Sequence, residues 1–89
     1  MDKEYQITMK KEVLTEFAAS ILAKYNNYII ENNISRSDVK NPVVSKIKDI
    51  SNLMNDITPK YNTISELDLV EGILKNLDKY IEGMKKNAK

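Results

Sequence analysis

An apolar seam near the C-terminal end is the feature that most constrains the fold of this chain. Thr63 and Glu66 precede it at the separation of a capping box, in which a hydroxyl and a carboxylate satisfy free N–H groups at a helix start. A seam of this kind lies along one side of an α-helix and has to be buried. The pattern predicts a helix over about residues 64–86. Six apolar residues form the seam at alternating spacings of three and four: Leu67, Val70, Leu74, Leu77, Ile81 and Met84.

Two further stretches show the same helical periodicity and predict helices over about residues 8–32 and 42–57. In the second of these, Asn41 is placed to cap the first turn, and Pro42 suits the first helical position, where no N–H is needed. Thr58-Pro59 is expected to end that helix, because proline disfavours helical geometry in the residue before it. The expected buried stripe of the first stretch is Leu14, Ala18, Ile21, Tyr25 and Tyr28, widened by Val13, Phe17 and Ile29. That of the second is Val43, Ile47, Ile50, Met54 and Ile57.

Short connections join these three amphipathic stretches, and no alternating strand pattern competes with them. The turns are expected at residues 33–41 and 58–63. Because 89 residues with 42% hydrophobic side chains allow one core and little else, the sequence predicts a single all-α domain over residues 1–89. The fold expected is a small antiparallel three-helix bundle.

Missing residue types narrow the chemistry. The chain has no His and no Cys, so it has no imidazole base, thiolate nucleophile, tetrahedral zinc site or disulfide. Its two glycines, Gly72 and Gly83, cannot build a phosphate-cradling loop. A domain this small also rarely encloses a substrate pocket. Composition still allows a purely carboxylate Mg²⁺ or Ca²⁺ site. We nevertheless expect a binding module rather than an enzyme, with no catalytic residue, no metal and no cofactor.

The charge pattern gives no sign of nucleic acid or membrane as a partner. The formal net charge is +1, from 14 basic and 13 acidic residues, and the lysines are too scattered to form a nucleic-acid stripe. The N-terminal residues are too polar for a signal peptide, and no run of 18 apolar residues occurs. We expect a cytoplasmic protein.

One set of residues lies opposite the predicted core of the first helix. Two interpretations compete for this N-terminal ridge: a solvated helix face with Lys10, Lys11 and Lys24 nearby, or a recognition helix that presents two carboxylates and an aromatic ring to a partner. Exposed charge is the surface norm, so the first interpretation is the default from pattern alone. The ridge consists of Tyr5, Met9, Glu12, Glu16 and Ser20 about one turn apart, with Thr8 beside them.

The N-terminal part of the chain resembles the epsilon antitoxins, small three-helix partners of zeta toxins in plasmid-borne toxin–antitoxin systems. Order and spacing agree without a gap, whereas the later helices share only pattern and length with that family, and the tryptophan expected in the third helix is missing. The residues that carry the resemblance are Tyr5, Thr8, Glu12-Val13-Leu14-Thr15-Glu16-Phe17-Ala18-Ala19-Ser20, Asn27-Tyr28-Ile29-Ile30 and Ser37-Asp38.

The resemblance implies a mechanism. Zeta toxins are P-loop kinases that phosphorylate UDP-N-acetylglucosamine, and the epsilon partner lays its N-terminal helix against the nucleotide site and blocks ATP. By this resemblance, Glu12 and Glu16 would occupy the phosphate region, with Tyr5, Thr8 and Met9 on the surrounding surface. It also implies a heterotetramer of two antitoxin and two toxin chains, in which the antitoxins would meet through their second and third helices.

Two alternatives from other classes remain. A bacteriocin immunity protein is also a small helical bundle, although its distinctive residues tend to lie near the C-terminus. A DNA-binding regulator is disfavoured because no basic recognition helix is present.

The seam of the third helix also has two interpretations, a bundle core or a dimer seam. A dimer needs a second apolar face on this helix, and the sequence offers only a thin one of Leu69, Ile73 and Tyr80.

Overall fold

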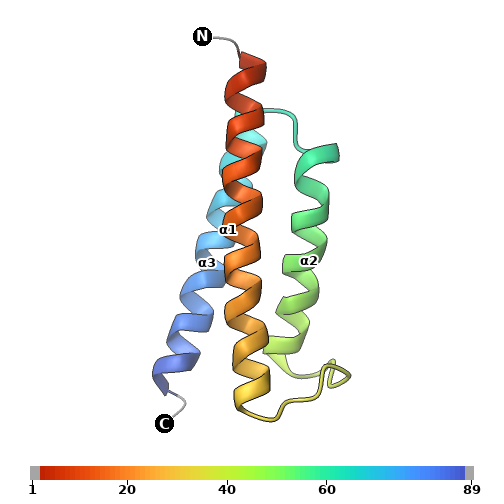
Figure 1. The fold of residues 1–89 in the computed structure, drawn as a ribbon, viewed down its shortest axis with the longest axis vertical. Helices are drawn as coiled ribbons and strands as arrows, with labels where there is room; N and C mark the ends of the chain where they lie inside the picture. The colour runs from red at the N-terminus through yellow and green to blue at the C-terminus, as the bar shows by residue number, and fades with distance from the viewer. Residues whose placement is uncertain (1–2, 88–89) are drawn as a thin grey trace.

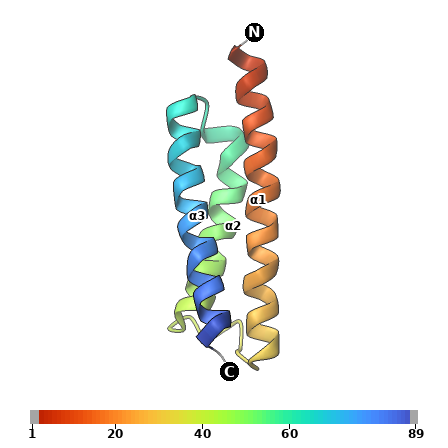
Figure 2. The same cartoon turned by 90° about the vertical axis from the view of Figure 1, so that its left-hand side faces the viewer.

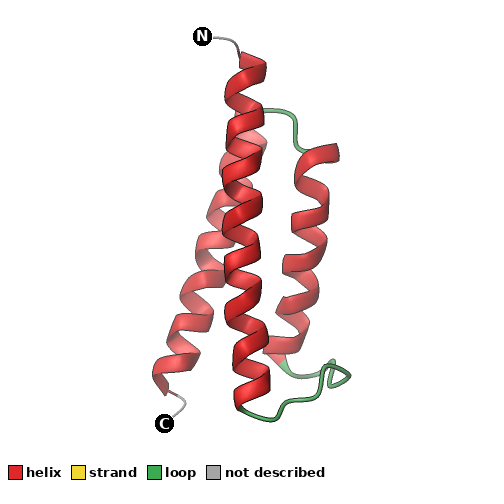
Figure 3. Cartoon of the chain, in the orientation of Figure 1, coloured by secondary structure: helices red, strands yellow, loops and turns green. Residues whose placement is uncertain are grey.

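The computed structural model describes residues 3–87 and contains three helices in that range, with no strand (Figure 3). They are α1 (Lys3–Glu31), α2 (Pro42–Lys60) and α3 (Ile64–Asn87). The prediction of an all-α three-helix bundle is confirmed. Residues 1, 2, 88 and 89 of the predicted domain lie outside the described residues.

The chain runs down α1, back up α2 and down α3, so that α2 is antiparallel to its two neighbours (Figure 1). Helix α1 packs extensively against both other helices, whereas α2 and α3 contact each other least. In both views the N-terminal end of α1 reaches beyond the turn between α2 and α3 (Figures 1 and 2). The long connection between α1 and α2 lies at the opposite end of the molecule.

Most of the predicted core is confirmed. All five residues of the predicted α1 stripe are buried, and Tyr25 uses its hydroxyl to donate a 2.6 Å hydrogen bond to the carbonyl of Leu77 on α3. Phe17, Ile47, Met54, Leu77 and Met84 are only partly buried and pack at the edge of the core. Fourteen residues form the buried cluster: Leu14, Ala18, Ile21, Tyr25, Tyr28, Ile29, Val43, Val44, Ile50, Ile57, Leu67, Val70, Leu74 and Ile81.

Both predicted helix starts are made by the expected side chains. Asn41 accepts a 2.9 Å hydrogen bond from the amide of Val43, and Pro42 takes the first position of α2. At the start of α3, the hydroxyl of Thr63 accepts from the amide of Glu66 at 3.2 Å. The Glu66 carboxylate in return accepts from the amide of Asn62 at 3.2 Å, one residue earlier than in the usual capping box.

Helix α1 starts at Lys3 rather than at the predicted Thr8. Ile7, which the predicted stripe omits, packs against the core one heptad before Leu14 and so extends the buried face backwards. At its other end, Asn33 adopts a left-handed conformation (φ 55°), and the amide of Ile34 donates to the carbonyl of Ile29 at 2.9 Å. This is a Schellman motif, which satisfies carbonyls that the helix end would leave free.

The prediction that Thr58-Pro59 ends α2 at residue 57 is wrong, because the helix continues to Lys60 with Pro59 inside its last turn. A proline there removes one hydrogen bond near the helix end, which is a smaller loss than in a helix interior. Two contacts hold this turn: Lys11 donates to the carbonyl of Thr58 at 2.7 Å, and Lys60 pairs with Asp56 at 3.5 Å. The extended backbone of Tyr61 (φ −103°, ψ 100°) then ends the helix.

Candidate functional site: the exposed face of α1

The six ridge residues of α1 are all exposed, as predicted for a face opposite the core. Of the two larger side chains, Tyr5 is 55% exposed and Met9 is 44% exposed. Together the six are called the α1 ridge: Tyr5, Thr8, Met9, Glu12, Glu16 and Ser20. The structure divides this ridge into two flanks with different chemistry.

The flank that faces α2 is acidic and hydroxyl-rich. Thr8, Glu12 and Glu16 line a surface hollow of about 490 Å³. Lys11 and Thr15 of α1 and Thr58 of α2 complete its lining. Thr58 belongs to the last turn of α2, beyond residue 57, and its carbonyl is bonded by Lys11 in the N-terminal half of α1.

The other flank is apolar. Tyr5 and Met9 line an open hollow of about 400 Å³ together with Gln6, Lys10 and Val13. Val13 was expected to widen the buried stripe, and that prediction is wrong, since its side chain is 58% exposed. Tyr5, Met9 and Val13 recur every four residues, so their stripe winds slowly around the helix away from the core. The spacing of four residues can be seen in the sequence and is the signal that assigns Val13 to this flank.

Ser20 belongs to neither hollow. Its hydroxyl donates a 2.7 Å hydrogen bond to the carbonyl of Phe17, three residues earlier in the same helix. Ser20 therefore stands at the end of the ridge with its donor already used, and the structure does not bring it together with Glu12 and Glu16.

The three lysines near the ridge are engaged elsewhere. Lys10 pairs with Asp68 at 2.6 Å and with Glu71 at 3.2 Å, both on α3. Lys24 pairs with two further carboxylates of α3, Asp78 at 2.7 Å and Glu82 at 2.8 Å. The third, Lys11, donates to the Thr58 carbonyl at 2.7 Å and to the Asn62 side chain at 2.8 Å.

Hydrogen bonding holds these lysine–carboxylate pairs in their charged forms. The bonds to Asp68 and Glu71 raise the pKa of Lys10, and those to Asp78 and Glu82 raise the pKa of Lys24. The bond from Lys10 lowers the pKa of the Glu71 carboxyl, and the bond from Lys24 lowers that of Glu82.

As a result, the ridge carboxylates have no cationic partner. Within residues 3–87, neither Glu12 nor Glu16 forms an ion pair, and the nearest lysines are bound to α2 and α3. Two carboxylates one helical turn apart can accept charge-assisted hydrogen bonds from donors of a second molecule. Exposure of all six ridge residues agrees with a solvated helix face that has Lys10, Lys11 and Lys24 nearby, as well as with a recognition helix.

The described residues offer no other obvious chemistry. They contain no group of three or more Asp and Glu side chains placed to hold a metal ion. No helix among them combines the length and the apolar character needed to cross a lipid bilayer. The exposed face of α1, with its two carboxylates and its apolar flank, is the candidate site.

Known proteins are similar to this chain over most of its length. The sequence profile of the family described as bacterial epsilon antitoxin matches residues 3–84. Antitoxin epsilon of Lactococcus lactis subsp. lactis is 29% identical over 84 residues, which are 94% of this chain and 95% of that protein. Antitoxin PezA of Streptococcus pneumoniae serotype 4 is 26% identical over 80 residues, 90% of this chain but only 51% of PezA. No solved structure matches the chain significantly.

Proposed function

This chain belongs to the bacterial epsilon antitoxin family, and on that premise we propose that it neutralises a zeta-type P-loop kinase toxin. The kinase would be one that phosphorylates UDP-N-acetylglucosamine, and α1 would occlude its ATP and phosphate site. As an antitoxin the chain is a non-enzymatic regulatory protein whose partner is a toxin.

The observation that carries this proposal is that Glu12 and Glu16 on α1 form no ion pair among the described residues. A P-loop is a concave nest of backbone N–H groups with a lysine, arranged to bind phosphate anions. Glu12 and Glu16 supply two anionic groups on an exposed helix, and the neighbouring Lys10 and Lys11 bond to groups of α3 and α2 instead of to them. In a partly desolvated site, their charge-assisted hydrogen bonds would contribute more than surface ion pairs do.

The rest of the ridge fits the surroundings of such a site. Thr8 lies beside the carboxylates and supplies a hydroxyl that can donate or accept a hydrogen bond. On the other flank, Tyr5 and Met9 expose apolar surface together with Val13. An exposed aromatic beside a flexible thioether is typical of protein interfaces. We assign Val13 to the toxin-binding surface, and Ser20 to its margin.

The test is protection of cells that express the toxin. The double variant Glu12→Lys/Glu16→Lys should weaken the complex by about 3–5 kcal/mol, because two cations would meet the P-loop lysine. A matched control is Glu31→Lys/Asp49→Lys, which makes the same change in net charge at exposed positions away from the ridge. Cells with the wild type or the control should survive, and cells with the ridge variant should not. If the ridge variant protects as well as the wild type, the phosphate-site proposal is wrong.

We further propose the assembly that the family resemblance implies, two antitoxin and two toxin chains with the antitoxins in contact through α2 and α3. Helix α3 leaves Leu69 and Ile73 exposed, and Ile73, Leu77 and Tyr80 line a hollow at the α2–α3 groove with Lys46. Helices α2 and α3 also contact each other least, so this side of the bundle is the most open.

Sedimentation of the co-purified complex tests the assembly. The wild-type complex should sediment as four chains, and Leu69→Asp/Ile73→Asp should give complexes of one antitoxin with one toxin. A complex of two chains from the wild type would refute the tetramer while leaving the toxin-binding proposal intact.

A further inference from the structure

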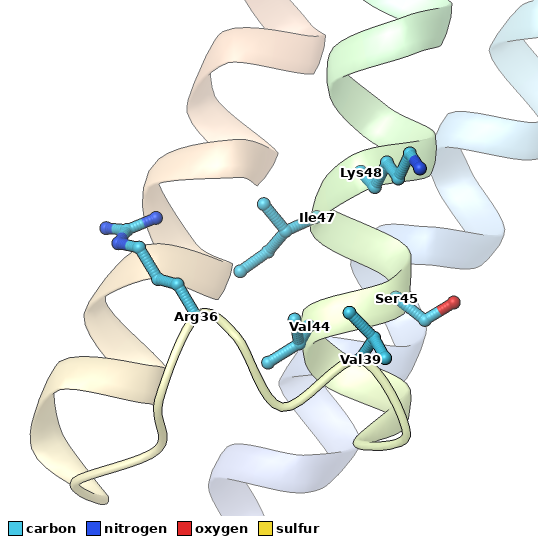
Figure 4. Close-up of a pocket in the computed structure, with 6 residues that line it drawn as sticks. All are labelled: Arg36, Val39, Val44, Ser45, Ile47 and Lys48. Carbon is cyan, nitrogen blue, oxygen red and sulfur yellow. The ribbon is translucent and has the colours of Figure 1, made fainter.

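A second surface feature lies at the other end of the long axis, beside the connection between α1 and α2. It is an open groove of about 360 Å³ between residues 36–39 of that connection and the first turns of α2. Arg36 stands at the side nearer α1 and Lys48 lies on α2, with the apolar side chains between them (Figure 4). The lining consists of Arg36, Val39, Val44, Ser45, Ile47 and Lys48.

The walls of this groove are held in place by the fold. Arg36 donates a 2.7 Å hydrogen bond to the side chain of Asn26 on α1, which fixes the connection against that helix. The capped start of α2 at Asn41 positions Val44 and Ser45. These bonds form within the chain itself and hold both walls of the groove in place.

The floor of the groove is apolar and partly uncovered. Val44 is buried and Ile47 is partly buried, but Val39, on the loop, is 75% exposed. A lone exposed valine is ordinary, whereas one that continues an apolar strip of the groove adds surface that a ligand can cover.

The charge of the groove is one-sided. Its lining contains two cations and no carboxylate. Within residues 3–87, the guanidinium of Arg36 bonds only to a neutral amide, and Lys48 forms no ion pair. Arg36 therefore keeps free donors in a geometry that suits a carboxylate.

We propose that this groove binds an acidic, apolar peptide segment of a second partner protein. An apolar side chain of the peptide would lie along Val39 and Ile47, and its carboxylates would pair with Arg36 and Lys48. An acidic, apolar peptide matches this lining, because the groove combines a strip of apolar side chains with two cations and no carboxylate. The groove and the α1 ridge lie at opposite ends of the bundle, so both sites can be occupied at once.

Titration of the full chain with synthetic peptides, followed by two-dimensional NMR of its backbone amides, tests this inference. The probe is an acetylated Leu-Asp-Glu-Leu peptide with a free carboxylate. The matched probe is Leu-Asn-Gln-Leu with an amidated end, which has the same size and no charge. Laurate, a fatty acid, is the third probe.

The acidic peptide should shift the amide signals of Val39, Val44 and Ile47, and the neutral peptide should bind more weakly by at least about fivefold. Replacing Lys48 with Gln should weaken the binding of the acidic peptide by a similar factor, since it removes one unpaired cation without removing a hydrogen bond. Lys79→Gln, the same change on an exposed face of α3, should have no effect. Val39→Glu places a carboxylate in the groove at an exposed position and should abolish binding while toxin neutralisation persists.

Equal binding of the two peptides would overturn the proposal, as would shifts that map away from the groove. Binding of laurate at these residues without binding of the acidic peptide would identify a fatty-acid site and also refute it. Loss of toxin neutralisation in Val39→Glu would refute the independence of the two sites. Because the readout is direct binding to the antitoxin alone, its failure is distinct from a failure of the toxin proposal.

Discussion

The two ridge carboxylates of α1, Glu12 and Glu16, and four carboxylates of α3 are chemically alike but have opposite surroundings. On α3, Asp68 and Glu71 are bound by Lys10, and Asp78 and Glu82 are bound by Lys24. On α1, the two ridge carboxylates face solvent without a cationic partner among the described residues. The same residue type thus joins two helices in one region and remains free for another molecule in the other.

This difference arises from the direction in which the lysines of α1 point. Lys10, Lys11 and Lys24 all reach across to α2 or α3, so they add cross-links to the bundle and leave the outer face of α1 negative. Carboxylates that are paired within the fold contribute to stability, and under the proposed function Glu12 and Glu16 contribute to toxin binding. Variants on the two helices should therefore separate stability from toxin affinity.

The largest effect is expected for charge reversal on the two helices. Glu12→Lys/Glu16→Lys should reduce the affinity for the toxin by about 100-fold or more, with the melting temperature nearly unchanged. Asp78→Lys/Glu82→Lys should lower the melting temperature, because it places three cations where Lys24 formed two ion pairs, and should leave the affinity unchanged. Calorimetric titration and thermal unfolding monitored by circular dichroism measure the two quantities. The comparison fails if both variants change the same quantity.

Removal of the Tyr25 hydroxyl should have the next largest effect. Tyr25→Phe deletes the hydrogen bond to the Leu77 carbonyl and should lower the free energy of unfolding by about 1 kcal/mol. Toxin affinity should not change, since Tyr25 lies on the core side of α1. Urea unfolding of the two proteins checks the value, and a loss of affinity in this variant would show that the ridge and the core are coupled.

Tyr25→Phe should also change how the free energy of unfolding depends on pH in the alkaline range. Burial, with smaller contributions from the charges of Tyr80 and Asp78, raises the pKa of Tyr25 far above its ordinary value of 10.0. The folded state therefore retains this proton longer than the unfolded state, and the associated stability is complete below pH 10 and is lost as the pH rises beyond it. The free energy of unfolding should fall more steeply above pH 10 in the wild type than in Tyr25→Phe. Equal slopes would show that this hydroxyl is not buried.

A smaller loss is expected for a single cross-link. Lys24→Met keeps the packing of the aliphatic stem but removes both ion pairs with α3, and it should cost about 0.5 kcal/mol, as for a partly exposed pair. High salt should reduce the difference between Lys24→Met and the wild type. A difference that does not depend on salt would point to packing rather than charge.

The smallest effect should appear at acid pH. Lys10 lowers the pKa of Glu71, and Lys24 lowers that of Glu82, from the ordinary 4.5. The stability from these pairs is present above pH 4.5 and is lost as the pH falls through the lowered pKa values. Melting temperatures between neutral and acid pH should therefore fall more in the wild type than in Lys10→Met/Lys24→Met. A parallel decline of the two would contradict the role given to these pairs.

The sequence predicts the fold in most respects because its signals are local. The seam of α3, the Asn41 cap and the Thr63–Glu66 pair depend on residues a few positions apart. The cap forms as expected, four of the six seam residues are buried, and the Glu66 carboxylate accepts from the amide of Asn62 instead of from that of Thr63. The helix ends that differ depend on distant partners. Thr58 remains helical beside Pro59 with the help of Lys11 from α1, a contact that no local pattern reveals.

The candidate site could be predicted only in outline. Periodicity alone places all six ridge residues on one exposed face, but it cannot tell which lysines neutralise which carboxylates. That assignment requires α3 to lie beside Lys10 and Lys24, which is a property of the whole bundle. The place of Thr58 in the site likewise depends on the packing of α2 against α1. Val13, in contrast, could have been assigned to the exposed face from its spacing of four residues from Met9.

The most direct test of the central claim is displacement of a fluorescent ATP analogue from the purified toxin by the antitoxin. The proposal predicts that the wild-type chain releases the analogue as the complex forms. Glu12→Gln/Glu16→Gln, which keeps the shape of both side chains and removes their charge, should require a much higher concentration to release it. If the analogue stays bound in the wild-type complex, α1 does not occupy the nucleotide site, and the toxin is neutralised in another way.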